Sequence, residues 1–202
     1  ILRDNIWGSL EQDTFRRDFT INALYYCPIS GKIEDHNSGI AHIQNKKIVS
    51  IGDPMKRFSE DPVRSLRAIR FSNKLNFKID KNIKDAIYKK GYLLENISNA
   101  RLFDEFCKIF LSGIAEKNFN KLVSFNLNKY LILTNPNGSE FSQNLIKEAL
   151  INTDKRVKND QSVTPGFLIA AMLWPEVLKR SKGDKEINLR KFFRSMDQIL
   201  RN

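Results

Sequence analysis

Acidic and arginine side chains are concentrated in residues 60–71, at a spacing that suits recognition of a nucleobase. A carboxylate only accepts hydrogen bonds, whereas a guanidinium only donates them. Side by side, Asp61 and Arg64 would accept from an exocyclic amine and donate to the adjacent ring nitrogen, a pair that both adenine and cytosine offer. Guanine and uracil present the opposite polarity, and each mismatched buried group costs roughly 1–3 kcal/mol. The alternative is an ordinary helix with salt bridges along its surface.

A second segment, residues 16–26, places two arginines and an aspartate ahead of the run F-T-I-N-A. An arginine can bind a phosphate or a ribose hydroxyl, and an aspartate can accept a hydrogen bond from the 2′-hydroxyl. An Asp18 that accepts this bond would favour ribonucleotides over deoxyribonucleotides. The alternative is a surface Arg–Asp pair that contributes about 0–1 kcal/mol.

Hydrophobic periodicity and turn signals predict the helices and strands that carry these residues. The pattern predicts a helix over residues 16–23, strands over 24–29 and 32–34, and a brief β-like run over 47–51. Amphipathic helices are then expected. Ser59 is predicted to cap the first of them, which carries Pro62 in its first turn and ends near Leu75. Its inward face would consist of Val63, Leu66 and Ile69. Further helices are predicted over residues 81–90, 100–111, 142–152, 166–180 and 187–200.

The composition limits the partners and the compartment. The chain has 202 residues, 41% of them hydrophobic, and its net charge of +11 makes a polyanion the default partner. A lysine-rich hydrated surface without such a partner is the alternative. The sequence has no apolar run long enough to span a bilayer. Two distant cysteines without C-x-x-C spacing favour reduced thiols, and we therefore expect a cytoplasmic protein. Because it begins with Ile1 rather than methionine, we expect it to be a piece of a longer protein.

Both motifs resemble those of the class II nucleotidyltransferases, which are the bacterial poly(A) polymerases and CCA-adding enzymes. Residues 16–23 match the family pattern R-R-D-F-T-x-N-A, and residues 60–71 match E-D-x-x-R-x-x-R-A-x-R-F. The resemblance continues through residues 100–103, 152–156 and 165–174, so it extends over nearly the whole chain.

The resemblance implies a mainly α fold: a small α/β remnant of a nucleotidyltransferase head followed by a helical neck and body. We expect the remnant over residues 1–53, the neck with the base reader over 54–112, and an RNA-binding body over 113–202. The resemblance also implies that Asp61 and Arg64 read the base with support from Glu60 and Arg67. Contacts to sugar and phosphate are implied for Arg17, Asp18 and Asn22.

The chain departs from the family pattern in two places. The segment that usually reads D-x-x-G-G-x-x-D-L is here residues 35–43, with Ser38 in place of a glycine and His42 in place of the second acid. The family's G-G-x-x-R-D segment and its metal-binding D-x-D pair have no counterpart, because the sequence contains neither G-G nor D-x-D. In the family those carboxylates hold two metal ions at the reaction centre.

The implied function is therefore part of a template-independent RNA nucleotidyltransferase that transfers AMP from ATP to RNA 3′ ends. Magnesium would be held by the head region that this chain lacks, and the chain alone is expected to be inactive. The alternatives are a CCA-adding tRNA nucleotidyltransferase and an RNA- or nucleotide-binding module without catalysis.

Two other groups of residues were candidates for binding. His36 and His42 lie near Asp35, but two histidines and one acid in a loop are more often solvated residues, so no metal site is predicted here. Basic side chains gather in clusters that could contact an RNA backbone, and two neighbouring phenylalanines, Phe192 and Phe193, could stack bases. The residues predicted to contact RNA are Lys155, Arg156, Lys158, Arg190 and Lys191.

Overall fold

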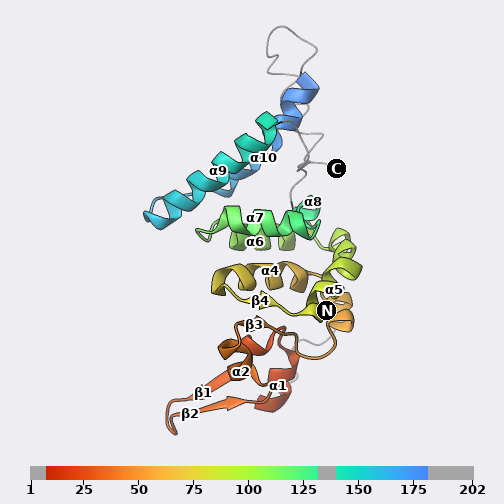
Figure 1. Ribbon diagram of the computed structural model, residues 1–202, viewed down its shortest axis with the longest axis vertical. Coiled ribbons are helices and arrows are strands. Elements are labelled where there is room, and N and C mark those ends of the chain that lie inside the picture. The colour runs from red at the N-terminus through yellow and green to blue at the C-terminus, as the bar shows by residue number, and fades with distance from the viewer. Residues whose placement is uncertain (1–7, 132–139, 182–202) are drawn as a thin grey trace. The chain divides into compact units, whose positions relative to one another are not determined.

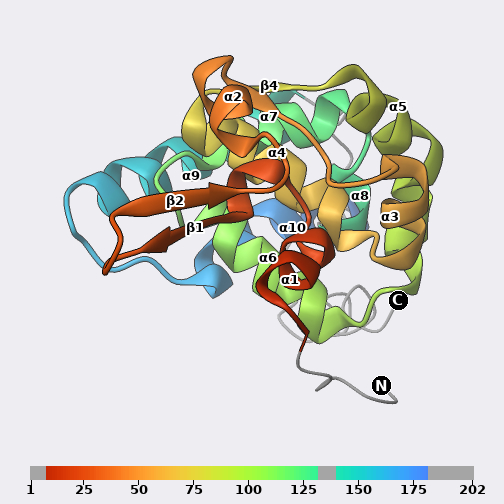
Figure 2. The ribbon, with the colours of Figure 1, turned by 90° about the horizontal axis from the view of Figure 1, so that it is seen from below.

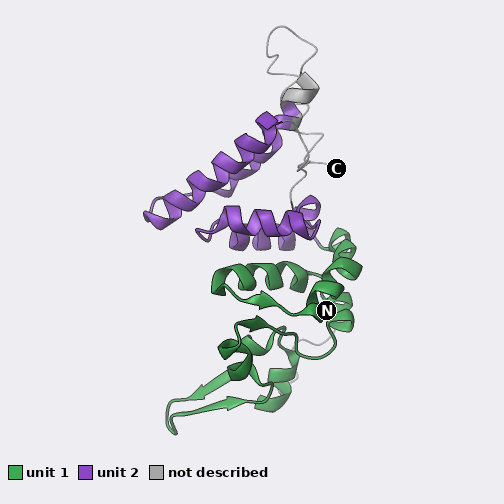
Figure 3. Cartoon of the chain, in the orientation of Figure 1, with its two compact units in different colours: residues 1–97 green, residues 98–202 purple. Residues whose placement is uncertain are grey.

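The computed structural model describes residues 8–131 and 140–181, and most of these residues are helical (Figure 1). Within these described residues, every strand lies in the first 80 positions, which include the expected head remnant. The mainly α fold with a small α/β part near the N-terminus is therefore confirmed. The chain divides into two compact units, residues 1–97 and 98–202 (Figure 3). The three-part division at residues 53 and 112 stays a proposal.

Unit 1 combines short helices with two two-stranded sheets. β1 pairs with β2 in antiparallel register from Leu24↔Asp35 to Cys27↔Lys32, and the two strands lie alongside each other in Figure 2. β3 pairs in parallel with β4. The elements are α1 (Leu10–Arg16), η1 (Thr20–Asn22), β1 (Leu24–Cys27), β2 (Lys32–Asp35), α2 (Gly39–Gln44), β3 (Lys47–Ile48), α3 (Pro54–Glu60), α4 (Val63–Leu75), β4 (Lys78–Ile79), α5 (Lys81–Lys90) and η2 (Gly91–Asn96).

The predicted helix over residues 16–23 is wrong. Arg16 is instead the last residue of α1. That helix begins with a capping box between Ser9 and Gln12. The backbone then runs extended: the amide of Thr20 donates to the Val49 carbonyl at 3.0 Å, and that of Ile51 donates to Asp18 at 3.1 Å. This pairing uses groups that a helix would need, so only η1 remains helical. The strand pair that follows confirms the predicted hairpin.

The helix predicted to start at Ser59 is in fact two helices. Asp53 caps α3 by accepting from the Met55 amide at 3.1 Å, with Pro54 at the first helical position. Ser59 lies inside α3, where its hydroxyl donates to the Met55 carbonyl at 2.9 Å. The residue before a proline avoids the α region, and Asp61 is accordingly extended at φ −144°. The predicted cap at Ser59 is therefore wrong, whereas the predicted end at Leu75 is confirmed.

The core of unit 1 forms where α4 faces the other elements. Val63, Leu66 and Ile69 are all buried, as the helical spacing predicts, and Phe19 and Phe58 are buried with them. Burial of each such side chain contributes roughly 1.5–3 kcal/mol relative to exposure. The apolar stripe thus fixes which face of α4 turns inward, and with it the direction of the arginines on the same helix.

Unit 2 consists of helices in the part of it that is described. The predicted helices at residues 100–111 and 166–180 are confirmed within a residue or so, and the one at 142–152 is longer than predicted. The short helices α7 and α8 were not predicted, and the helix predicted over 187–200 lies outside the described residues. The elements are α6 (Asn99–Phe110), α7 (Ala115–Ser124), α8 (Asn128–Leu131), α9 (Glu140–Lys158) and α10 (Pro165–Ser181).

The structure also bears on two expectations from the sequence, the lack of a membrane-spanning segment and the reduced cysteines. Among the described helices, none has the length and apolar character needed to cross a bilayer. Cys27 and Cys107 are both free thiols, and both are half-buried.

Candidate nucleotide-binding site

The two motifs meet inside unit 1 although 49 residues of chain separate their contacting side chains. Arg67 Nε donates to Asp18 Oδ2 at 2.5 Å, and Asp18 is only 7% exposed. The other carboxylate oxygen, Oδ1, accepts from Asn22 Nδ2 at 3.0 Å and from the Phe19 amide at 2.9 Å. Three of the predicted nucleotide-binding residues therefore form one hydrogen-bonded group.

The position of this group follows from the packing of Phe19. The ring of Phe19 is fully buried and meets Phe71 of α4 edge to face, with the ring centroids 6.0 Å apart. One turn before Phe71, Arg67 places its guanidinium 5.6 Å from the same ring. Burial of an aromatic anchor thus brings Asp18, the residue before Phe19, next to the arginine face of α4.

The predicted base reader lies at the break between α3 and α4. Glu60 ends α3, and Asp61 occupies the extended connection, where its carboxylate accepts from the Val63 amide at 3.3 Å. Arg64 follows in the first turn of α4, and its amide donates to the Asp61 carbonyl at 3.2 Å. The break set by Pro62 therefore brings an acceptor and a donor side chain to one corner of unit 1.

The side chain of Arg64 is held in place by groups of the protein itself. Its Nη1 donates to the Arg57 carbonyl at 3.0 Å and lies 3.6 Å from Glu60 Oε2. The side chain is only 15% exposed. Burial lowers the pKa of the Arg64 guanidinium, and the positive charge of Arg57 lowers it further. Arg64 remains a cation, because an arginine is not deprotonated in a protein.

Arg17, which is predicted to bind a phosphate or the sugar, belongs to a second cluster of hydrogen-bonded side chains. Its Nε and Nη2 lie 3.2 and 3.1 Å from Asp13 Oδ2, and Nη2 also donates to the Tyr25 hydroxyl at 2.8 Å. The Tyr25 hydroxyl in turn donates to Asp13. The hydrogen bond from Tyr25, followed by that from Arg17, lowers the pKa of the Asp13 carboxyl. Arg17 is thus the exposed end of an ordered cluster.

Sequence reasoning missed two residues of this site, Asp13 and Arg57. Asp13 lies in α1, which the pattern did not predict, and it contacts Arg17 one turn later. Arg57 Nη2 donates to the carbonyls of Arg16 and Arg17, each at 2.7 Å, and its Nη1 donates to Glu60 at 3.1 Å. The helix-start signal Asp53-Pro54 and the i, i+3 spacing of Arg57 and Glu60 were the signals that could have identified it.

The segment 35–43 that departs from the family pattern includes most of α2, which packs against η1. The Asp35 carboxylate accepts from the amides of Asn37, Gly39 and Ile40 at 3.2, 2.8 and 2.9 Å, and so begins α2. Ser38 has φ +57°, a left-handed conformation that glycine adopts more easily. A side chain on Gly39 would meet the Thr20 carbonyl oxygen at 2.5 Å.

The two histidines of the metal hypothesis make other contacts. His42 Nδ1 lies 3.0 Å from the Thr20 hydroxyl, and His36 Nε2 lies 3.5 Å from Glu34. Over residues 8–131 and 140–181, the structure contains no group of three or more His, Cys, Asp or Glu side chains that could hold a metal ion.

The predicted RNA-binding residues belong to unit 2. Lys155, Arg156 and Lys158 all lie in the last turn of α9, and the two lysines are exposed. Arg156 Nε donates to the Ser162 carbonyl at 3.0 Å. Arg190 and Lys191 lie outside the described residues.

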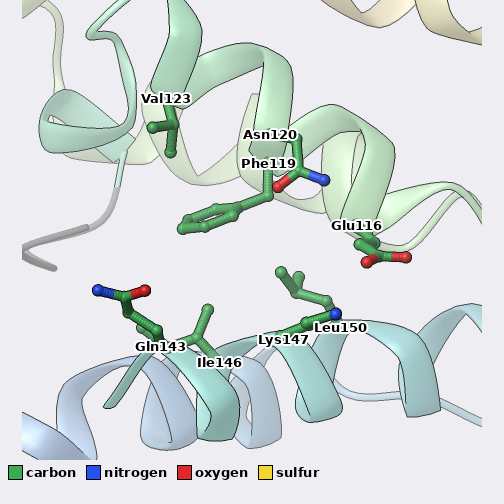
Figure 4. Close-up of a pocket in the computed structure, with 8 residues that line it drawn as sticks. All are labelled: Glu116, Phe119, Asn120, Val123, Gln143, Ile146, Lys147 and Leu150. Carbon is green, nitrogen blue, oxygen red and sulfur yellow. The ribbon is translucent and has the colours of Figure 1, made fainter. Parts of the chain in front are cut away.

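A pocket of about 330 Å³ opens between α7 and α9 within unit 2 (Figure 4). Figure 4 shows Phe119 and Val123 of α7 on one side and Ile146 of α9 on the other. Glu116 and Lys147 bring opposite charges to its lining. The pocket contains none of the residues that the motifs single out.

Comparisons with known proteins agree with the two motifs. Residues 3–49 match the family model "Poly A polymerase head domain", and residues 76–142 match "Probable RNA and SrmB- binding site of polymerase A". Poly(A) polymerase I of Salmonella typhi is 40% identical over 187 residues, which cover 90% of this chain and 40% of that protein. The CCA-adding enzyme of Lactococcus lactis is 31% identical over 186 residues, 91% of this chain and 42% of that protein.

A solved structure extends the similarity to the fold. The CCA-adding enzyme of Bacillus stearothermophilus in complex with CTP matches 74% of this chain and 35% of its own, with a TM-score of 0.59 and 31% identity. The chain spans about 40% of the length of the curated relatives it matches.

Proposed function

Because the chain belongs to the class II RNA nucleotidyltransferase family, with poly(A) polymerase I and the CCA-adding enzymes, we propose that it forms the nucleotide-reading part of a poly(A) polymerase. The full-length protein would add AMP from ATP to RNA 3′ ends in the cytoplasm. The observation that carries this proposal is the junction of the two motifs, in which Arg67 of one motif bonds Asp18 of the other.

In this proposal the base contacts Asp61 and Arg64. The carboxylate accepts from the exocyclic amine of adenine, while the guanidinium donates to the neighbouring ring nitrogen. Glu60 supports Arg64 at 3.6 Å and thereby restricts the rotamers of the donor. This donor–acceptor pair rejects guanine and uracil, and it leaves cytosine as the competitor that a further contact must exclude.

The ribose and phosphates would meet the first motif. Asp18 is oriented by Arg67 and Asn22, so its carboxylate is preorganised to accept from a 2′-hydroxyl. Arg17, which Asp13 and Tyr25 hold, would donate to a phosphate or to a ribose oxygen. Lys155, Arg156 and Lys158, together with Arg190 and Lys191, would contact the RNA backbone.

Magnesium is the cofactor that the family implies, and the described residues of this chain do not fit it. They contain no cluster of three ligating side chains, and the whole sequence lacks a D-x-D pair. No step of the reaction is therefore assigned to metal ligands in this chain. Binding of base and ribose is assigned to unit 1, and we expect the isolated 202 residues to add no nucleotide to RNA.

The test is extension of an RNA primer by the full-length protein, with each of the four ribonucleotides supplied alone and with ATP and CTP together. Long tails with ATP alone are the expected result. Addition limited to C, C and A on a tRNA would instead identify the CCA-adding alternative. RNA and ATP binding without any addition would identify a binding module, and extension by the isolated chain would contradict the absence of a reaction centre.

A further inference from the structure

We infer that Arg57 is a positioning residue that holds the ribose-side motif in register with the base reader. This inference rests on the proposed function and names a residue that neither motif contains. Arg57 lies in α3, and its guanidinium reaches both motifs at once: Nη2 donates to the carbonyls of Arg16 and Arg17, and Nη1 donates to Glu60. The contacts with residues 16 and 17 connect segments that lie 41 and 40 residues apart in sequence.

The two carbonyls are those at the end of α1. A helix leaves its last carbonyls without partners inside the helix, and its C-terminal end carries partial negative charge. The planar fork of a guanidinium can satisfy two such oxygens while a second nitrogen bonds a carboxylate. Arg17 directly precedes Asp18, so this contact fixes the backbone on one side of Asp18. Arg67 fixes its side chain from α4.

The backbone of Arg57 serves the base side of the site. Its carbonyl accepts from Arg64 Nη1 at 3.0 Å and from the Asp61 amide at 3.1 Å. These two bonds use main-chain oxygen and survive any change of side chain. A substitution at Arg57 should therefore loosen the ribose side, residues 16–18, much more than the base reader.

The arrangement is not the one that stability alone favours. Arg57 and Arg64 both approach Glu60, at 3.1 and 3.6 Å, so two guanidinium cations share one carboxylate, and the charge of Arg57 disfavours that of Arg64. The Arg57 side chain is 18% exposed, and within the described part of the chain its buried Nε finds no hydrogen-bond partner. Buried polar groups without a partner are costly. A shorter or neutral side chain would avoid these costs but could not reach the end of α1 and Glu60 together.

The test uses Arg57→Lys and Arg57→Gln in the full-length protein, with Lys56→Ala as the control that removes an exposed charge from the same helix. Lysine keeps the charge but is a single point donor, so it cannot hold two carbonyls and Glu60 in one plane. We expect the KM for ATP to rise about 10-fold or more and the preference for ATP over dATP to fall about 10-fold, since small displacements of positioned groups cost factors up to about 100. Preference for ATP over GTP should change less than about 3-fold.

The outcomes separate positioning from folding and from the proposed function. Equal loss with ATP and dATP, or no loss in either Arg57 variant while the wild type is active, would overturn the positioning role. Thermal melting and RNA binding by each variant show whether a loss with every nucleotide comes from unfolding. A wild-type protein that adds no AMP to RNA overturns the proposed function, and this inference with it.

Discussion

The polar residues that we assign to ligands are held very differently in the two units. In unit 1, Asp18 and Arg64 are largely buried, and Arg67 bonds Asp18 across 49 residues of chain. Arg64 is held by closer groups, the Arg57 carbonyl and Glu60. In unit 2, Lys155 and Lys158 extend from the last turn of a single helix into solvent. Reading a base or a sugar edge requires donors and acceptors fixed to a few tenths of an ångström. Contact with an RNA backbone requires only positive charge within reach.

We therefore expect substitutions of these bonded residues in unit 1 to change nucleotide choice, and substitutions at the end of α9 to change only RNA affinity. The largest effect is expected at the base reader. Asp61→Ala or Arg64→Ala in the full-length protein should reduce kcat/KM for ATP by about two orders of magnitude, because each removes a ligand contact and leaves a partner unsatisfied. Discrimination against GTP and UTP should weaken as well, as measured by primer extension with each nucleotide.

The matched control for this prediction is Lys74→Ala, which removes an exposed charge from the last turn of the same helix. It should leave nucleotide preference unaltered. Should Asp61→Ala and Arg64→Ala keep the wild-type preference, these residues have no part in reading the base, and the fixed geometry of unit 1 has another purpose.

A smaller effect is expected at the sugar. Asp18→Ala removes the proposed acceptor for the 2′-hydroxyl, so the ratio of ATP to dATP use should fall about 10-fold. Part of the loss is structural, since Arg67 loses its 2.5 Å partner. A double-mutant cycle with Arg67→Met separates the two effects. Coupling between the residues should appear in stability, and Arg67→Met, which keeps the acceptor but loses its orientation, should reduce the sugar preference less than Asp18→Ala does. Equal losses with ATP and dATP would make Asp18 a purely structural residue.

The sequence was informative where local rules and the fold agree. The inward stripe Val63, Leu66 and Ile69 has helical spacing and is buried, and the end of α4 after Leu75 was also predicted. The break before Val63 was not, because both Ser59 and Asp53 are good helix caps and Pro62 is tolerated at the start of a helix. The choice between them depends on Pro62 forcing Asp61 out of the α region.

The partners of the site residues could not be predicted in the same way. Which aspartate meets Arg67, and which carbonyls meet Arg57, depends on contacts across 40 to 49 residues of chain. Spacing along a helix carries no information on such pairs. The helix predicted over residues 16–23 failed for this reason, since its backbone is paired with residues 49–51 instead.

In unit 2 we expect a few-fold effect that depends on salt. Lys155→Ala and Lys158→Ala should each weaken RNA binding a few-fold at low salt. The slope of log affinity against log salt should decrease by up to about 0.7 for each lost contact with single-stranded RNA. Nucleotide preference should not change. Filter binding over a salt series measures this, with Lys56→Ala as the charge-matched control from unit 1. A lysine variant that alters ATP selectivity would end the distinction between the units.

The smallest effect is expected at Asp35, whose carboxylate accepts three backbone hydrogen bonds but faces no proposed ligand. Burial raises its pKa, but the amides of Ile40, Gly39 and Asn37 outweigh burial and hold the pKa below the ordinary 3.8. A lowered pKa means that the charged form stabilises the fold above about pH 4 and that this contribution is lost as the pH falls. Asp35→Ala should therefore cost about 1 kcal/mol at pH 7, as loss of a helix-capping acceptor does.

Melting temperatures of wild type and Asp35→Ala, measured from pH 7 down to pH 3, check this prediction. The difference between the two proteins should shrink below about pH 4, because protonation removes from the wild type what the substitution removed from the variant. The ratio of ATP to dATP use should stay at the wild-type value at pH 7. A change in that ratio would mean that α2, which packs on η1 beside Asn22, helps to set the sugar preference. The fixed geometry of unit 1 would then extend beyond the two motifs.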